Sequence, residues 1–295
     1  MGPTAAGKTH VALEAAIRCG ATVVSVDSMQ VYRGMNIGTA KPSVAERDRV
    51  PHLMIDLVEP SVDYTVAQFQ RDARAGVASV DGPVLVVGGS GLHFRSLVDP
   101  LEFPPTDLAV RRQLDRAPLP ALLEELLAAD AGAGQALDLA NPRRVVRAVE
   151  ILRLTGSTPS ERLKSESAEA VRKYRSAFDL VVFGLDPGPD LEQRITHRTG
   201  LMRDLGLLDE VSRLAPSLGR LASLAVGYRD LLDVLTGAID LEEGFARVRR
   251  STLSLAKRQR TYFGRDPRIR WLPAGERTAT AAVETLVDAL REGAG

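Results

Sequence analysis

The chain has 295 residues, of which 44% are hydrophobic and 26% charged, proportions that are ordinary for a globular protein. Its 38 basic and 38 acidic residues cancel, so net charge neither favours nor excludes a nucleic-acid partner. The single cysteine excludes an intramolecular disulfide and a cysteine-rich zinc site. Because the sequence has neither a signal peptide nor a long apolar run, we expect a cytoplasmic protein without a membrane segment.

Helices and strands are predicted to alternate in the amino-terminal part. A helix over 9–18 is followed by a β-branched run at 22–26, which predicts a buried strand ending at Asp27. A glycine-containing loop over 33–42 and a helix over 67–80 lead to a second buried strand at 83–87, which runs into glycines at 88–91. This order is typical of an α/β fold, and we expect a P-loop NTPase-like parallel sheet with helices on both faces.

The pattern changes near residue 101, where prolines are followed by Leu/Ala-rich helices. Strand patterns return at 180–185 and 269–272, helices are predicted from 190 to about 255, and a last helix covers 278–290. We therefore expect an α/β core formed by 1–104 and 176–295, with a small inserted helical domain at 105–175.

The first residues after Met1 form a phosphate-binding motif. They fit G-x-x-x-x-G-K-[ST], in which glycines let backbone N–H groups point at phosphate oxygens and the following helix adds its positive end. A chance match is the alternative, and it is weakened by the helix and strand that follow. The predicted diphosphate-binding residues are Gly2, Pro3, Thr4, Ala5, Ala6, Gly7, Lys8 and Thr9.

A loop of this type normally follows a buried strand, and none precedes Gly2 in this sequence. We therefore expect that the first core strand is missing and that stability is lowered. Adding several β-branched residues upstream is expected to raise the melting temperature.

Asp27 is the candidate carboxylate at the end of the next strand. It can serve as a general base or hold Mg²⁺ through water, and the structural alternative is a capping or turn aspartate. The sequence has no N-K-x-D segment, which argues against a GTPase, and the strand at 83–87 ends in glycines rather than an acid. These absences favour a diphosphate that departs as a leaving group.

Taken in order, several segments resemble bacterial tRNA dimethylallyltransferases, the isopentenyl-diphosphate:tRNA transferase (IPP transferase) family. The most specific is D-S-x-Q-V-Y-R at 27–33, continued by G-T-A-K-P at 38–42. The P-loop, P-H-L-M-I-D-L-V-E-P at 51–60, G-G-S-G-L at 88–92, N-P-R-R-V-V-R-A-V-E at 141–150, G-Y at 227–228 and A-K-R-Q at 256–259 extend the resemblance over most of the chain.

The resemblance implies transfer of a dimethylallyl group from dimethylallyl diphosphate to N6 of adenosine 37 in the tRNA anticodon loop. Thr9 then binds Mg²⁺, the implied cofactor, and Asp27 accepts the N6 proton. Ser90 replaces a family threonine whose hydroxyl helps the catalytic geometry. Arg198 reaches the diphosphate from a helix face that it shares with Arg194, and ordinary surface arginines are the alternative for this pair.

Implied tRNA contacts are spread over the chain. Between Arg247 and Arg270 nine basic residues accompany one acid, Asp266, a cluster that suits an RNA backbone, although a solvated helix face is the alternative. Arg143, Arg144 and Arg147 form a smaller basic cluster that also suits a phosphate backbone. The tRNA-binding residues expected from the resemblance and from these clusters are Asp27, Ser28, Met29, Gln30, Ser90, Arg111, Arg143, Arg144, Arg147, Lys257, Arg258 and Gln259.

Two other functions fit parts of the sequence. A P-loop small-molecule kinase would use ATP, and an inactive RNA-binding relative would bind tRNA without turnover. We expect a monomer, because no apolar helix stripe remains unassigned.

Overall fold

The computed structural model describes residues 1–275 and 278–293. The chain divides into two compact units: Met1–Leu97 with Leu180–Gly295, and Val98–Asp179. The insertion predicted at 105–175 lies inside the second unit. None of the described helices is long and apolar enough to span a bilayer.

A three-stranded parallel sheet forms the centre of the first unit. Its strands β1 (Thr22–Ser25), β2 (His52–Leu53) and β3 (Val84–Val87) are ordered β2-β1-β3, and the register places Val23 opposite both His52 and Leu85. The two strands predicted in the amino-terminal part, at 22–26 and 83–87, became β1 and β3 because their β-branched residues pack on a pleated surface. Strand β2 was not predicted; with two residues, it is too short to give an alternating pattern.

The remaining strands, β4 (Val182–Asp186) and β5 (Ile269–Pro273), form a separate parallel pair. The single sheet expected from the sequence is therefore two sheets in the described residues. Met1 continues beside β4: its carbonyl oxygen accepts from the N–H of Leu185 at 2.9 Å, and its amine donates to the oxygen of Phe183 at 2.5 Å. The expectation that a first core strand is missing stays a prediction.

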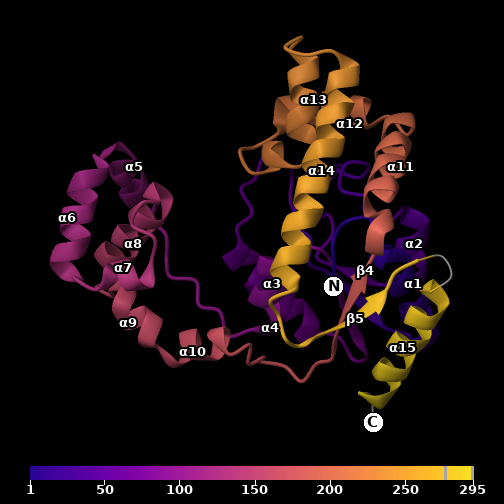
Figure 1. Ribbon diagram of the computed structural model, residues 1–295, viewed down its shortest axis with the longest axis horizontal. Coiled ribbons are helices and arrows are strands. Elements are labelled where there is room, and N and C mark those ends of the chain that lie inside the picture. The colour runs from indigo at the N-terminus through magenta and orange to yellow at the C-terminus, as the bar shows by residue number, and fades with distance from the viewer. Residues whose placement is uncertain (276–277, 294–295) are drawn as a thin grey trace. The chain divides into compact units, whose positions relative to one another are not determined.

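Helices α1 (Lys8–Cys19) and α15 (Ala279–Glu292) lie side by side (Figure 1) and pack together. Their hydrophobic cluster includes side chains from both sheets. Their cluster contains the buried residues Val11 and Val287, and Leu85 of β3 and Leu185 of β4 pack against it. One hydrophobic core thus holds both sheets and fixes the start of α1 near the ends of the strands.

The other helices of the first unit are bounded by recognisable signals. Thr65 and Gln68 form a capping box at the start of α3, and Gly206 in the left-handed region precedes α12. Figure 1 shows α14 as the longest helix, running beside α11. The bounds are α2 (Val44–Arg49), α3 (Val66–Ala78), α4 (Gly91–Val98), α11 (Leu191–Asp204), α12 (Leu207–Leu214), α13 (Tyr228–Leu235) and α14 (Leu241–Phe263), with single turns at Gly188–Asp190, Ala215–Ser217 and Ala222–Leu224.

The second unit is entirely helical in its described secondary structure. Its own core is formed by Leu114, Leu122, Leu126 and Val149. The helices are α5 (Leu108–Arg116), α6 (Leu119–Ala129), α7 (Ala133–Ala136), α8 (Pro142–Thr155), α9 (Pro159–Lys164) and α10 (Glu166–Arg172).

Candidate active site

The loop before α1 has the backbone of an anion-binding turn. Ala5 and Gly7 have positive φ angles of 62° and 84°, and a Cβ on Gly2 would lie 2.7 Å from the oxygen of Leu185. The first turn of α1 contains no acidic residue. Its N–H groups lack intrahelical partners, so the turn presents donors and the positive helix end to the same place.

Two half-buried cations lie beside this loop. The Nζ of Lys8 donates to the oxygen of Pro3 at 2.6 Å, and the Nε of Arg198 is buried with no hydrogen-bond partner in the described residues. Burial, and then the charge of Arg198, lower the pKa of Lys8 to about 7, although the carboxylate of Asp27 opposes this. Burial also lowers the pKa of Arg198. Two like charges held together with an unused donor form a site for an anion.

The cations share one cavity, of about 90 Å³, with Asp27. The cavity brings together residues from the loop, from the ends of β1 and β3, and from α11 and α14. Its polar lining residues are Thr4, Lys8, Thr9, Ser25, Asp27, Gln30, Thr39, His52, Arg198 and Gln259. Of the three predicted catalytic residues, Asp27 and Arg198 line the cavity and Ser90 does not, but its neighbours Gly88 and Gly89 do.

Asp27 lies just after the end of β1, and one of its carboxylate oxygens stabilises the turn that follows. Its Oδ1 accepts from the N–H of Met29 at 2.8 Å, and its Oδ2 makes no hydrogen bond within the described chain. The turn role and a chemical role are therefore compatible, because one oxygen shapes the loop while the carboxylate lines the cavity.

Ser90 forms a pair with His93, which the sequence did not assign to the site. The Oγ of Ser90 lies 2.7 Å from Nδ1 of His93, whose ring packs edge-on against Phe69 with centroids 4.7 Å apart. Burial lowers the pKa of His93 to about 4, with Asp27 opposing the shift. The imidazole is thus neutral at pH 7, and Nδ1 can accept the proton of the serine hydroxyl.

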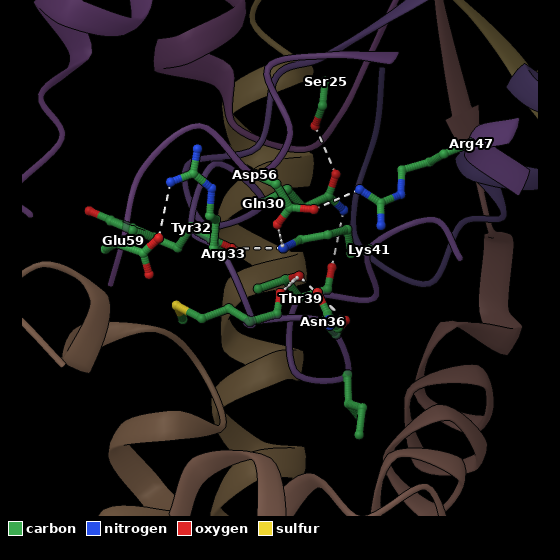
Figure 2. A network of polar contacts seen from close by, with 12 residues as sticks. Ser25, Gln30, Tyr32, Arg33, Asn36, Thr39, Lys41, Arg47, Asp56 and Glu59 are labelled. Atoms are coloured by element: carbon green, nitrogen blue, oxygen red, sulfur yellow. Dashed lines mark hydrogen bonds and ion pairs between the residues drawn. The ribbon is translucent and has the colours of Figure 1, made fainter. Parts of the chain in front are cut away.

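A polar network holds the loop that follows Asp27 (Figure 2). Lys41 is buried and donates to the oxygen of Tyr32 at 2.7 Å and to Asp56 at 2.6 Å, and Arg47 binds the second oxygen of Asp56 at 2.6 Å. Gln30 accepts from Ser25 and donates to the oxygen of Thr39. Gln30, predicted as a tRNA contact, is therefore also part of the scaffold. The G-T-A-K-P motif could have indicated the role of Lys41.

Residues 36–38 of the same loop are held by Glu210 in α12. Its carboxylate accepts from the N–H groups of Asn36, Ile37 and Gly38 at 2.9, 2.9 and 3.0 Å, and from the hydroxyl of Tyr228 at 2.5 Å. Sequence reasoning missed Glu210, because it lies about 170 residues from the loop and no local motif marks it.

Arg194 is held next to a second, larger cavity of about 1170 Å³, which also contains Lys8 and Arg198. Its Nη2 donates to the oxygen of Ala274 at 2.8 Å. One of its donors is therefore used by the protein, and the rest of its guanidinium lines the groove beside the loop.

In the second unit, the predicted arginines fall into two kinds. Arg143 and Arg144 are exposed at the start of α8. Arg111 and Arg147 both bind the buried carboxylate of Glu150 at 2.5 Å, and Arg147 also donates to the oxygens of Pro104 and Pro105. The charge of Arg147 is thus largely used inside its own unit.

Several basic side chains of α14 already form ion pairs within the protein. Arg247 and Arg250 pair with Glu243, and Arg260 pairs with Asp186. Lys257 and Arg258 are exposed and form no ion pair within the described residues. Gln259 instead points inward: its Oε1 accepts from the N–H of Thr4 at 2.8 Å, and its Nε2 donates to the oxygen of Gly89 at 2.9 Å.

No group of three or more His, Cys, Asp or Glu side chains in the described part of the chain could hold a metal by itself. The hydroxyl of Thr9 is exposed at the first turn of α1, and with Asp27 it lines the cavity. Two oxygen donors suit a Mg²⁺ ion whose remaining ligands are substrate phosphates and water.

The fold and the site define an α/β protein with an anion-binding loop and a carboxylate in one cavity. The family model for IPP transferase matches residues 30–266, and the chain belongs to this family. It is 42% identical to a tRNA dimethylallyltransferase of Bifidobacterium longum (93% of this chain, 85% of the relative) and 43% identical to one of Streptomyces coelicolor (93% and 89%). A solved tRNA isopentenylpyrophosphate transferase of Bacillus halodurans superposes with a TM-score of 0.70 at 33% identity, over 99% of this chain and 95% of that one.

Proposed function

We propose that this chain transfers the dimethylallyl group of dimethylallyl diphosphate to N6 of adenosine 37 in a tRNA anticodon loop and releases diphosphate. The observation that carries the proposal is the pair of half-buried cations, Lys8 and Arg198, in one cavity with Asp27. The names of the relatives, tRNA dimethylallyltransferase, support the choice of substrates.

We assign the diphosphate to the loop of residues 2–9, acting as a P-loop. Negative charge gathers on the diphosphate as the bond between C1 of the allyl group and oxygen breaks. The backbone N–H groups at the start of α1, Lys8 and Arg198 stabilise that charge more in the transition state than in the ground state, which accelerates the reaction. Arg194, at the adjoining groove, adds positive charge to the same region.

The nucleophile is the neutral N6 amine of the adenine, which must be held in line with C1. As the N6–C1 bond forms, N6 becomes acidic and its proton passes to the carboxylate of Asp27. The hydroxyl of Ser90, with its proton directed to His93, presents oxygen lone pairs to the substrates. The step is balanced: one C–O bond breaks, one C–N bond forms, and one proton moves to Asp27.

Mg²⁺ fits the donors that the chain offers, the Thr9 hydroxyl and Asp27, the latter directly or through water. When bound, the ion neutralises charge on the diphosphate. Both donors already line the same cavity.

The RNA would be held by contacts to its backbone, which offset the cost of about a few kcal/mol of extruding the target base. Because the substrate is tRNA, we place the reaction in the cytoplasm. The proposed contacts are Asp27, Ser28, Met29, Gln30, Ser90, Lys257 and Arg258 in the first unit and Arg111, Arg143, Arg144 and Arg147 in the second.

The test is to incubate the chain with dimethylallyl diphosphate, Mg²⁺ and unmodified tRNA and to analyse the digested nucleosides by mass spectrometry. We expect N6-(dimethylallyl)adenosine and one equivalent of diphosphate. ATP-dependent phosphorylation of a small acceptor, or tRNA binding without product, would contradict the proposal.

A further inference from the structure

Gln259 connects two loops that are far apart in the sequence. It is half-buried in α14, and its single side-chain amide bonds the backbone of the diphosphate loop at Thr4 and of the loop before Ser90 at Gly89. The two proposed halves of the site, one for diphosphate and one for the reacting adenine, thus share one hydrogen-bonded link.

The chemistry of the two partners allows only one orientation of the amide. The N–H of Thr4 needs an acceptor and the carbonyl of Gly89 needs a donor, so a flipped Gln259 would oppose like groups at both ends. A glutamate would satisfy Thr4 and repel Gly89, and an aliphatic side chain would satisfy neither. Among residues of this length, only glutamine joins both loops.

The side chain of Gln259 is closely packed against the glycines of the Ser90 loop. A Cβ on Gly89 would lie 2.5 Å from Nε2 of Gln259, and one on Gly91 would lie 2.1 Å from the ring of Tyr262, one turn further along α14. The buried residues Ala256 and Phe263 fix this part of the helix in the core. The helix therefore presses directly against the glycines of the Ser90 loop.

We propose that Gln259 is a positioning residue that sets the separation of the diphosphate loop and the Ser90 loop, rather than a tRNA contact. The reacting adenine and the leaving diphosphate must be placed to a fraction of an ångström. Misplacement by about 1 Å can cost on the order of a hundredfold in rate. The inference rests on the proposed function, because turnover is one of its measures.

The decisive variant is Gln259→Met, which keeps length and removes both hydrogen bonds. We expect kcat at saturating tRNA to fall about tenfold or more, the Kd for inorganic pyrophosphate with Mg²⁺ to rise severalfold, and the Kd for tRNA to stay within about twofold. A tRNA contact would give the opposite split: weaker tRNA binding with unchanged kcat and unchanged pyrophosphate binding. That split would overturn the proposal.

Gly89→Ala provides a second route to the same disturbance, because its methyl group displaces the amide of Gln259. The double variant Gly89→Ala with Gln259→Ala makes room for the methyl, so its loss in kcat should be smaller than the product of the two single losses. Multiplicative losses would contradict a direct coupling. Thr261→Ala, exposed two residues along α14, is the matched control and should keep parent values.

Pyrophosphate binding separates the two proposals. If the parent shows no transfer to tRNA, the proposed function fails, yet pyrophosphate titration of Gln259→Met still tests the link. Parent-like pyrophosphate affinity together with parent-like kcat in Gln259→Met would refute the link, whatever the melting temperature of the variant.

Discussion

Asp27 has a structural task and, in our proposal, a chemical one. Its Oδ1 holds the N–H of Met29, while the carboxylate lines the cavity with Lys8 and Arg198. The P-loop and D-S-x-Q motifs predicted that Lys8 and Asp27 belong to one site, because the carboxyl ends of parallel strands meet at one edge of a sheet. Arg198 was expected there only from the family resemblance. The direction of the Gln259 amide was beyond prediction, since it depends on two loops that only the folded chain brings together.

Replacing Asp27 separates its two tasks. Asp27→Ala should lower kcat by about a hundredfold or more, the usual contribution of a positioned base, while tRNA affinity changes little because it is spread over many phosphate contacts. Asp27→Asn keeps an acceptor for Met29 but cannot take a proton, so it should show the same loss. Single-turnover assays and filter binding measure the two effects, and parent-rate turnover by Asp27→Asn would exclude the base role.

His93 makes stability depend on pH. Its pKa is about 4 in the folded chain against an ordinary 6.5, because burial disfavours the imidazolium. The unfolded chain binds more protons between these values, so stability rises with pH across this window and is lost as the pH falls. The difference corresponds to roughly 3 kcal/mol.

The check is urea unfolding from pH 4 to 7. Replacing His93 by Gln should flatten the curve, because the variant no longer gains a proton on unfolding. The partly buried His52, whose pKa burial also lowers, remains in both proteins and provides the background slope. An unchanged slope in the variant would contradict the assignment.

Among the structural elements, the loop between Asp27 and Pro42 is held at two points. Lys41 and Asp56 fix one end, and Glu210 from α12 fixes the N–H groups of 36–38. A Cβ on Gly38 would lie 2.4 Å from the ring of Tyr228, so the loop also packs directly against α13. Burial, and then Glu210, raise the pKa of Tyr228, which keeps its hydroxyl a donor.

Replacing Glu210 by Gln should therefore be costly. The amide NH₂ would face backbone donors, leaving buried N–H groups unsatisfied, and we expect a loss of about 2–3 kcal/mol in the free energy of unfolding. Tyr228→Phe removes one hydrogen bond and should cost about 1 kcal/mol. Asp209→Asn, exposed in the same turn, is the control and should stay within about 0.5 kcal/mol. Equal stabilities for Glu210→Gln and the control would contradict this clamp.

The pattern of elements was predictable where a short-range signal exists. Strands β1, β3, β4 and β5 are β-branched or apolar runs, and α1, α3 and α15 follow helical periodicity, so all were predicted. Strand β2 and the clamp of Glu210 were not. The strand is stabilised by its pairing with β1, and the clamp by contacts across about 170 residues, and neither leaves a local pattern.

At the scale of the whole molecule, composition does not show which basic side chains are unpaired and can bind RNA. The nine basic residues near the end of α14 include several that pair with acids outside the run, such as Glu243, Asp233 and Asp186. In the described structure, other exposed members of the run form no ion pair: Arg249, Lys257, Arg258, Arg265 and Arg270. In the described part of the second unit, Arg143 and Arg144 are likewise exposed and unpaired with an acid. The charge available for RNA is therefore smaller than the sequence suggested.

This distribution predicts how tRNA affinity depends on salt. Binding should weaken steeply as salt rises, because each phosphate contact releases condensed counterions. Replacing Lys257 and Arg258 together by Ala should reduce the slope of log K against log salt by about 1.4 to 1.8, at 0.7 to 0.9 per contact. Arg247→Ala should leave the slope unchanged, because Glu243 and Asp233 already neutralise that guanidinium. Filter binding between about 50 and 200 mM salt measures all three, and equal slopes for the parent and the double variant would place the RNA backbone on another surface.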